Sequence, residues 1–178
     1  GYTYLISLQK QAVDAQSERF LNAISVVVNA DRDIYQAKVA ELTLVTSSNT
    51  DKTYLNEHQE NADQVKERFG QYLSYMSPYT EVVDRFRHFD SAFDSWYSAS
   101  KNFINDPQNS EKKQIAEQTF SALRDILDKA GEAADKTSKS ETEKLMDGVI
   151  SFKVKLMIMI AIVLLVAGWF SYYVPRQL

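Results

Sequence analysis

Residues 156–175 contain no charged side chain. This run constrains the possible folds of the chain more than any other feature. As a helix rising about 1.5 Å per residue, a run of this length spans the roughly 30 Å hydrocarbon core of a bilayer. The aromatic residues near its end are Trp169, Phe170, Tyr172 and Tyr173. Amphipathic rings favour the headgroup layer, so these residues are expected to be membrane-interface anchors. We predict a transmembrane helix over residues 154–174.

The remainder of the chain is expected to form four helices. Turn-forming residues cluster at 46–51, 77–78 and 105–110, and each cluster offers a side chain that can cap the following helix. Pro78 and Pro107 can each occupy a first helical position, where the missing N–H costs nothing. The predicted helices cover residues 3–46, 52–76, 78–104 and 110–152, and the last continues into the apolar run.

Apolar residues in the second and third predicted helices recur at three- and four-residue spacing, which is typical of bundle packing. In the second helix they are Leu55, His58, Ala62, Val65, Phe69, Tyr72 and Met76. In the third they are Phe86, Phe89, Phe93, Trp96, Ser100 and Phe103. The simplest interpretation is that both stripes form core, with a packed histidine at position 58; an aromatic ligand cage or a metal-bound histidine is the alternative.

The two long outer segments have different patterns. Apolar residues of the first helix occupy more than one face: Phe20, Leu21, Ile24, Val27, Val28, Ile34, Tyr35, Val39 and Leu42. A helix with two apolar faces must bury both, so we expect a homodimer. The stripe of the fourth helix is made largely of small residues, which permit close approach and sliding: Ile115, Thr119, Ala122, Ile126, Ala130, Ala133, Thr137 and Ser140.

The predicted fold is all-α. The first and fourth helices are each about 43 residues long, near 65 Å, whereas the second and third are about 26 residues, near 40 Å. These lengths favour an antiparallel up-down-up-down four-helix bundle with long first and fourth helices, the fourth continuing into the transmembrane helix. The shape is that of an elongated sensor, and not of a compact enzyme.

The composition argues against several functions. A net charge of −4 without a basic cluster excludes nucleic acid as a partner, because phosphate neutralisation needs concentrated Lys and Arg. The chain has no cysteine, and its two histidines lie on different predicted helices without carboxylates at metal-ligand spacing. We therefore expect no enzymatic activity, no cofactor and no metal.

Residues 29–37, Asn-Ala-Asp-Arg-Asp-Ile-Tyr-Gln-Ala, are followed by Glu41 and a turn. This segment resembles the first helix of the four-helix-bundle sensor domain of bacterial methyl-accepting chemotaxis receptors. The apolar run and the following Val-Pro-Arg-Gln-Leu resemble the second transmembrane helix of that family and the start of the cytoplasmic HAMP linker. The resemblance covers nearly the whole chain.

The resemblance implies an organisation and a set of partners. Residues 1–153 would be a periplasmic ligand-binding domain, residues 154–174 would cross the bacterial inner membrane, and residues 175–178 would begin the cytoplasmic HAMP linker. A first transmembrane helix, most of HAMP and the kinase-controlling hairpin would lie outside this sequence. The family works as homodimers that report through an adaptor protein to a cytoplasmic histidine kinase.

Three consecutive charges, Asp31, Arg32 and Asp33, stand in the apolar first helix. In an antiparallel bundle, the level of Arg32 corresponds to about residues 66, 90 and 124 of the other helices. Charged residues expected near this level are Glu67, Arg68, His88, Asp90, Arg124 and Asp125. One hypothesis is an ion network that fixes helix register, with Arg32 paired to Asp125 or Glu67 and Asp33 paired to Arg68 or Arg124.

The other hypothesis is a polar ligand pocket at the dimer interface. In the aspartate-sensing relatives, first-helix arginines and a threonine-bearing turn of the fourth helix hold the ligand, and Arg32 and Thr119 have comparable positions here. Candidate ligand-binding residues are Asp31, Arg32, Asp33, Tyr35, Gln36, Thr119 and Arg124. Either arginine can grip a carboxylate in two-point fashion, with Tyr35, Gln36 and Thr119 donating hydrogen bonds, and the aspartates can hold an amine. An amino acid, an organic acid or an amine is the expected ligand.

Two other functions are compatible with the sequence. HAMP linkers precede several outputs, so the chain could be the input domain of a sensor histidine kinase or of a cyclic-dinucleotide enzyme. A ligand-free, membrane-tethered helical bundle is the alternative from another class. It predicts a plain apolar seam between subunits, against which the charges at positions 31–33 argue.

Overall fold

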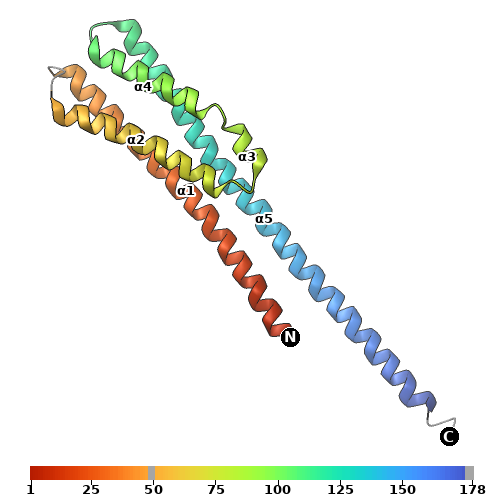
Figure 1. The fold of residues 1–178 in the computed structure, drawn as a ribbon. Helices are drawn as coiled ribbons and strands as arrows, with labels where there is room; N and C mark the ends of the chain where they lie inside the picture. The colour runs from red at the N-terminus through yellow and green to blue at the C-terminus, as the bar shows by residue number, and fades with distance from the viewer. Residues whose placement is uncertain (48–50, 175–178) are drawn as a thin grey trace. The chain divides into compact units, whose positions relative to one another are not determined.

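The computed structural model describes residues 1–47 and 51–174, and these form helices with no strand among them. The helices are α1 (Tyr2–Thr46), α2 (Lys52–Tyr75), α3 (Thr80–Arg85), α4 (Phe89–Asn105) and α5 (Ser110–Tyr173) (Figure 1). The prediction of an all-α protein is confirmed. Part of the predicted turn at 46–51 and the predicted HAMP start at 175–178 lie outside the described residues.

Two of the predicted capping side chains are in place. Asp51 accepts a hydrogen bond of 2.9 Å from the backbone N–H of Thr53 at the start of α2. The side-chain oxygen of Asn109 accepts one of 3.0 Å from the backbone N–H of Lys112 at the start of α5. Each bond satisfies a backbone donor that the first turn of a helix leaves free.

The prediction for the two prolines is wrong, because neither opens a helix. Pro78 lies in a turn closed by a 2.9 Å hydrogen bond from the N–H of Tyr79 to the carbonyl of Met76, and α3 begins only at Thr80. Pro107 lies in the turn that precedes Ser110, the first residue of α5. The prolines therefore shape the connections between helices.

The predicted third helix is interrupted. A pair of 3.1 Å backbone bonds, from Phe86 to Val83 and from Phe89 to Phe86, replaces the α-helical pattern and separates α3 from α4. Both phenylalanines are buried and both rings contact Phe69, at centroid distances of 6.1 and 3.8 Å. With hydrogen bonds from residue i+3 to residue i, the side chains of these two residues lie on the same side of the turn. Phe86 and Phe89 can therefore both pack on Phe69.

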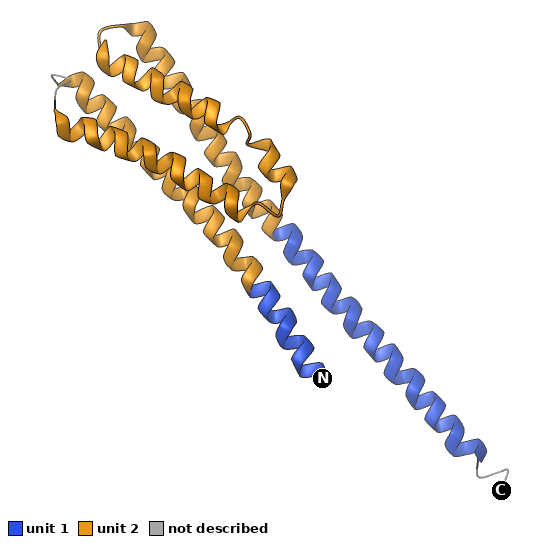
Figure 2. Cartoon of the chain, in the orientation of Figure 1, with its two compact units in different colours: residues 1–14, 139–178 blue, residues 15–138 orange. Residues whose placement is uncertain are grey.

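The chain divides into two compact units (Figure 2). Unit 2 comprises residues 15–138 and contains the core; unit 1 comprises residues 1–14 and 139–178. Within unit 2 one cluster of buried apolar side chains draws on all five helices. Its largest fully buried members are Phe20, Ile34, Phe69, Tyr72, Met76, Trp96, Leu123 and Leu127.

The predicted stripes of the second and third helices are core, with one exception. Leu55, near the start of α2, is exposed. The predicted stripe of the fourth helix is displaced: Ile115 and Ala122 are exposed, and the buried residues of α5 are Ala116, Leu123, Ile126, Leu127, Ala130, Ala133 and Ala134. Larger leucines fill the core there, so α5 buries fewer small residues than the pattern suggested.

Unit 1 contains the apolar run. Of the helices in the described residues, α5 is the one long and apolar enough to cross a membrane, judged by length and composition. Side chains of the run are exposed in the structure. At its end the ring of Trp169 lies 5.3 Å from that of Phe170 and 5.2 Å from that of Tyr173, centroid to centroid.

Candidate functional site

Carboxylates of α1 reach three different helices of unit 2. Asp31 pairs with an arginine of α5, Asp33 with an arginine of α2, and Glu41 with a serine of α4. All three lie on α1 within about three helical turns. Polar side chains of α1 therefore connect it to α2, α4 and α5.

Asp33 forms the buried ion pair. Its side chain has no exposed surface, because it points to the same face of α1 as the core residues Ala30 and Ala37. Arg68 donates from Nε to Oδ2 of Asp33 at 2.5 Å, which confirms the predicted pairing. Oδ1 has no hydrogen-bond partner in the structure, although Nη2 of Arg32 lies 3.6 Å away.

The predicted pairing of Arg32 is wrong. Arg32 contacts Asp33 of its own helix and neither Asp125 nor Glu67, and its side chain is 57% exposed. Asp125 instead pairs at 2.8 Å with Lys129, one turn along α5. The rotation of α1 explains the difference, because the turn that buries Asp33 directs its neighbour Arg32 towards solvent.

Asp31, Tyr35 and Arg124 form a half-exposed cluster between α1 and α5. Arg124 donates from Nε to Oδ1 of Asp31 at 3.0 Å and from Nη2 to Oδ2 at 3.5 Å. The guanidinium carbon also lies 4.3 Å from the ring centroid of Tyr35, whose ring meets Phe120 edge-on at 5.6 Å. The hydrogen bond that Arg124 donates to Asp31 raises the pKa of Arg124 above its ordinary value. The sequence analysis placed these residues in one site, and they are in contact.

Two other predicted ligand residues do not join this cluster in the predicted way. The hydroxyl of Thr119 donates within its own helix, to the carbonyls of Ile115 at 2.7 Å and Ala116 at 3.1 Å. Its single proton is thus engaged, and only its lone pairs are free to accept a bond. Gln36 is exposed on α1.

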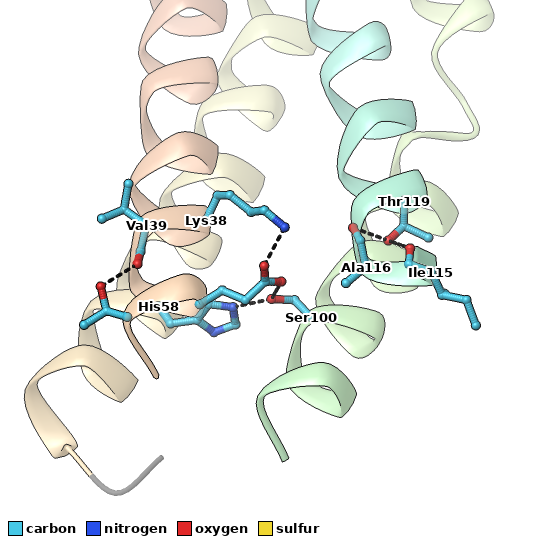
Figure 3. Close-up of polar contacts among 9 residues, drawn as sticks. Lys38, Val39, His58, Ser100, Ile115, Ala116 and Thr119 are labelled. Atoms are coloured by element: carbon cyan, nitrogen blue, oxygen red, sulfur yellow. Dashed lines mark hydrogen bonds and ion pairs between the residues drawn. The ribbon is translucent and has the colours of Figure 1, made fainter. Parts of the chain in front are cut away.

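A second polar network, which the sequence analysis did not identify, lies in the core near the end of α1. Figure 3 shows Lys38, His58 and Ser100 gathered around one carboxylate, that of Glu41. Ser100 donates to Oε1 of Glu41 at 2.7 Å, and Lys38 donates to Oε2 at 2.6 Å. Nε2 of His58 lies 2.8 Å from the Ser100 hydroxyl.

The directions of these bonds fix the state of His58. Because Ser100 has one proton and gives it to Glu41, Nε2 of His58 must carry the hydrogen and donate it to the serine. Burial, and secondly the charge of Lys101, lowers the pKa of His58 from 6.5 to about 4, so the ring is neutral at pH 7. The ring also stacks on Tyr97 at 5.5 Å, centroid to centroid.

The network has the residue types of a nucleophilic triad, but the hydrogen bond between the serine and the histidine runs in the opposite direction. A nucleophilic serine donates its proton to the histidine, whereas Ser100 accepts from His58. Ser100 is also fully buried, and no substrate reaches it. The network holds α1, α2 and α4 together. The available sequence signal was a histidine and a serine on otherwise apolar stripes, with an acidic residue at the matching level.

The outer face of α1 is apolar and uncovered. Its exposed residues are Leu21, Val28, Tyr35, Val39 and Leu42. Four of them recur every seven residues, which keeps them on one side of a helix. Tyr35 belongs both to this row and to the cluster with Asp31 and Arg124, so the apolar face and the polar cluster are continuous. We call this surface the outer α1 face.

Metal binding finds no support in the geometry: within residues 1–47 and 51–174, no three His, Asp or Glu side chains are grouped so as to hold an ion. No family model, no curated protein and no solved structure matches this chain.

Proposed function

We propose that the chain is the extracytoplasmic sensory region of a methyl-accepting chemotaxis receptor, which binds a small molecule at a homodimer interface and passes the signal across the inner membrane. The observation that supports the proposal most is that helix α5 has residues in both units. Its residues up to 138 contribute to the core of unit 2, and its later residues include the apolar run. A displacement of this helix within unit 2 would be the signal that the proposal requires.

We further propose that unit 2 is an antiparallel up-down-up-down four-helix bundle. The support is that α1, α2, α4 and α5 share one core cluster and are joined by short connections. Such connections favour antiparallel neighbours. Residues 1–153 would then lie in the periplasm, and residues after 174 would lie in the cytoplasm, where the receptor addresses an adaptor protein and a histidine kinase.

The proposed dimer interface is the outer α1 face. Aliphatic side chains such as Val28 and Val39 are more than 60% exposed there, and contact with the same face of a second copy would remove them from water. A two-fold interface is self-complementary, so a single apolar row is sufficient to form it. Each buried aliphatic side chain contributes about 1.5–3 kcal/mol.

The proposed ligand site lies where the polar cluster meets this interface. Arg124 already holds the carboxylate of Asp31 at two points, so a ligand carboxylate could replace that partner. A ligand amine could instead bind Asp31. Tyr35 lies against Arg124, and Arg32, Gln36 and the lone pairs of Thr119 are available for further contacts. Asp33 is excluded from ligand contact by its burial and by Arg68.

The proposed signal is a displacement of α5 along α1 of about 1–2 Å. Both helices bury small side chains in the shared core: Ala23, Ala30 and Ala37 of α1 at seven-residue spacing, and Ala130 and Ala134 of α5. A ligand that prefers one position needs to supply only about 1–3 kcal/mol of differential affinity. Tyr72 of α2 donates a 2.7 Å hydrogen bond to the carbonyl of Ala130, which gives α5 a defined resting position.

The test is a thermal-shift screen of the full chain in detergent against amino acids, organic acids, aromatic acids and amines. A ligand at about 100 times its dissociation constant stabilises the protein by roughly 2.7 kcal/mol. The expected result is a hit that disappears in Arg124→Ala and weakens in Arg32→Ala. Arg87→Ala is the matched control, because Arg87 is exposed and lies outside the cluster.

Absence of any hit, with dimerisation intact, would favour the ligand-free tethered bundle. A hit that survives Arg124→Ala would move the site away from this cluster. Locking α1 to α5 by a disulfide between engineered cysteines tests the displacement separately. Signalling by a full receptor that carries this lock would overturn the sliding mechanism.

A further inference from the structure

A cleft in unit 2 lies apart from the cluster at Asp31 and Arg124. Its volume is about 440 Å³, and its walls are Arg85, Phe86 and His88 on one side and α5 from Asp125 to Lys136 on the other. Small-molecule sites have volumes of roughly 300–1,000 Å³. The cleft is therefore large enough for a compact organic ligand.

The break between α3 and α4 forms one wall of this cleft. Arg85 ends α3, and Phe86 and His88 belong to the irregular turn that follows. His88 and Asp125 were predicted to lie near the level of Arg32, and both line this cleft. The lining residues of α5 recur at three- and four-residue steps, so they form one continuous face of that helix.

The cleft has three permanently positive side chains and two carboxylates in its lining. Asp125 pairs with Lys129 at 2.8 Å, and the pKa of Lys129 is raised first by Asp125 and further by Glu132. Both carboxylates of the cleft thus act on one lysine. Within the described residues, the other two permanent cations of the lining, Arg85 and Lys136, have no carboxylate in ion-pair contact. The cleft carries an excess of positive charge at these two side chains.

The floor of the cleft is apolar. Phe86, Ile126 and Ala133 line it, and each is mostly buried in the core beneath. An inorganic anion would leave the exposed part of this floor uncovered. An organic cation would face the unmatched positive charges of Arg85 and Lys136. A molecule with one anionic group and an apolar body satisfies both parts of the cleft.

We propose that this cleft binds a small organic monoanion, a carboxylate carried by an aromatic or short aliphatic body. The carboxylate binds at Arg85 and Lys136, and the body covers Phe86, Ile126 and Ala133. This site is distinct from the proposed interface site and needs only one copy of the chain. An occupant would contact α5 over about three turns, the same helix that continues into the apolar run.

The experiment is photolabelling of the full chain in lipid nanodiscs with 4-benzoylbenzoate, followed by mass-spectrometric mapping of the labelled residues. The neutral 4-benzoylbenzamide has the same body, so it reports labelling driven by apolar contact or by the lipid alone. The expected result is labelling of residues 85–88 and 126–133 by the carboxylate, about tenfold above that by the amide. Excess unlabelled benzoate should reduce it.

Variants assign the anion contact. Arg85→Ala with Lys136→Ala should lower the labelling of the cleft about tenfold, whereas Arg85→Lys with Lys136→Arg should retain it. The matched control is Arg87→Ala with Lys113→Ala, which removes the same charge outside the cleft and should leave labelling unchanged. Unchanged melting temperatures of all three double variants will show that each is folded.

Three results would overturn the proposal. They are equal labelling of the cleft by acid and amide, labelling that survives loss of both cations, and absence of label from the cleft. Label confined to residues 28–39 would contradict this cleft site while supporting the interface site. Failure of the interface ligand screen leaves the cleft result unaffected, so the two proposals fail separately.

Discussion

Each face of α1 carries side chains that are uncommon in its environment. The inner face buries the carboxylates of Asp33 and Glu41 almost completely, whereas the outer face leaves Val28 and Val39 more than 60% exposed. Each buried carboxylate has a partner on another helix. The exposed aliphatic residues have no such cover within the described chain. The inner face therefore fixes the position of α1 in unit 2, and the outer face is free to associate.

Buried charges can specify register even where they add little stability. A buried pair costs several kcal/mol in desolvation, which its attraction offsets only in good geometry. Asp33 and Glu41 can each meet their partners in one alignment of the helices, since a shift by one turn would leave the charge unpaired. Apolar contacts, by contrast, tolerate such a shift. The same reasoning predicts where substitutions should act most strongly.

The largest expected effect comes from Arg68→Ala. It leaves Asp33 buried without its main partner, which should lower the free energy of unfolding by about 3–5 kcal/mol. For a chain of this size the melting temperature should fall by roughly 10 °C. Thermal unfolding of the full chain in detergent, followed by near-ultraviolet circular dichroism, measures this.

Arg124→Ala provides the matched comparison on the half-exposed pair and should cost about 1 kcal/mol or less. Replacing both inner partners, as in Asp33→Leu with Arg68→Met, should recover most of the lost stability, because no buried charge is then unpaired. Equal losses for Arg68→Ala and Arg124→Ala would contradict the distinction between the two pairs.

The next effect concerns pH. The pKa of His58 is about 4 in the folded protein and 6.5 when free, so the unfolded chain binds more protons between these values. Stability from this group is fully present above about pH 6.5 and is lost as the pH falls to about 4; the total is about 3 kcal/mol. Unfolding measured at several pH values gives the slope.

His58→Gln is the control for the pH prediction. Glutamine keeps a donor for the Ser100 hydroxyl and does not titrate, so the stability of this variant should depend less on pH by about 3 kcal/mol over the same range. An identical pH dependence in both proteins would mean that other groups cause it.

The smallest effect on stability is expected at the outer α1 face. Val28→Lys and Val39→Lys should change the free energy of unfolding by less than about 0.5 kcal/mol, because these side chains are already in water. Dimerisation should nevertheless weaken strongly, by at least tenfold in the dissociation constant. Sedimentation of the detergent-solubilised chain measures the dissociation constant. Gln64→Lys is the control, because Gln64 is an exposed residue of α2. Dimerisation unaffected by both valine changes would place the interface elsewhere.

Much of the helical architecture was predictable because it depends on local signals. The apolar stripes of α2 and α4 identified the core side chains, and Asp51 and Asn109 marked helix starts through their capping groups. The break between α3 and α4 was not predictable in this way. It contains no glycine or proline, and it exists because Phe86 and Phe89 both pack on Phe69, a contact between distant parts of the chain.

The ion pairs near positions 31–33 were predicted only in part. The pair of Asp33 with Arg68 was among those expected. Arg32 instead points to solvent, and Asp31 pairs with Arg124. Sequence spacing gives the level of a residue along a helix to within about a turn, but the rotation of each helix about its axis decides which side chains meet. The buried network at Glu41 depends on three helices and escaped prediction for the same reason.

The helical structure, the run apolar enough to cross a membrane and the two apolar faces of α1 could all be derived from the amino-acid sequence. These properties follow from periodicity and from hydrophobicity summed along one segment. The covered face of α1, the partner of each carboxylate and the cleft at Arg85, Phe86 and His88 are known only from the folded chain. Those outcomes depend on contacts between side chains far apart in the chain, which no local pattern encodes.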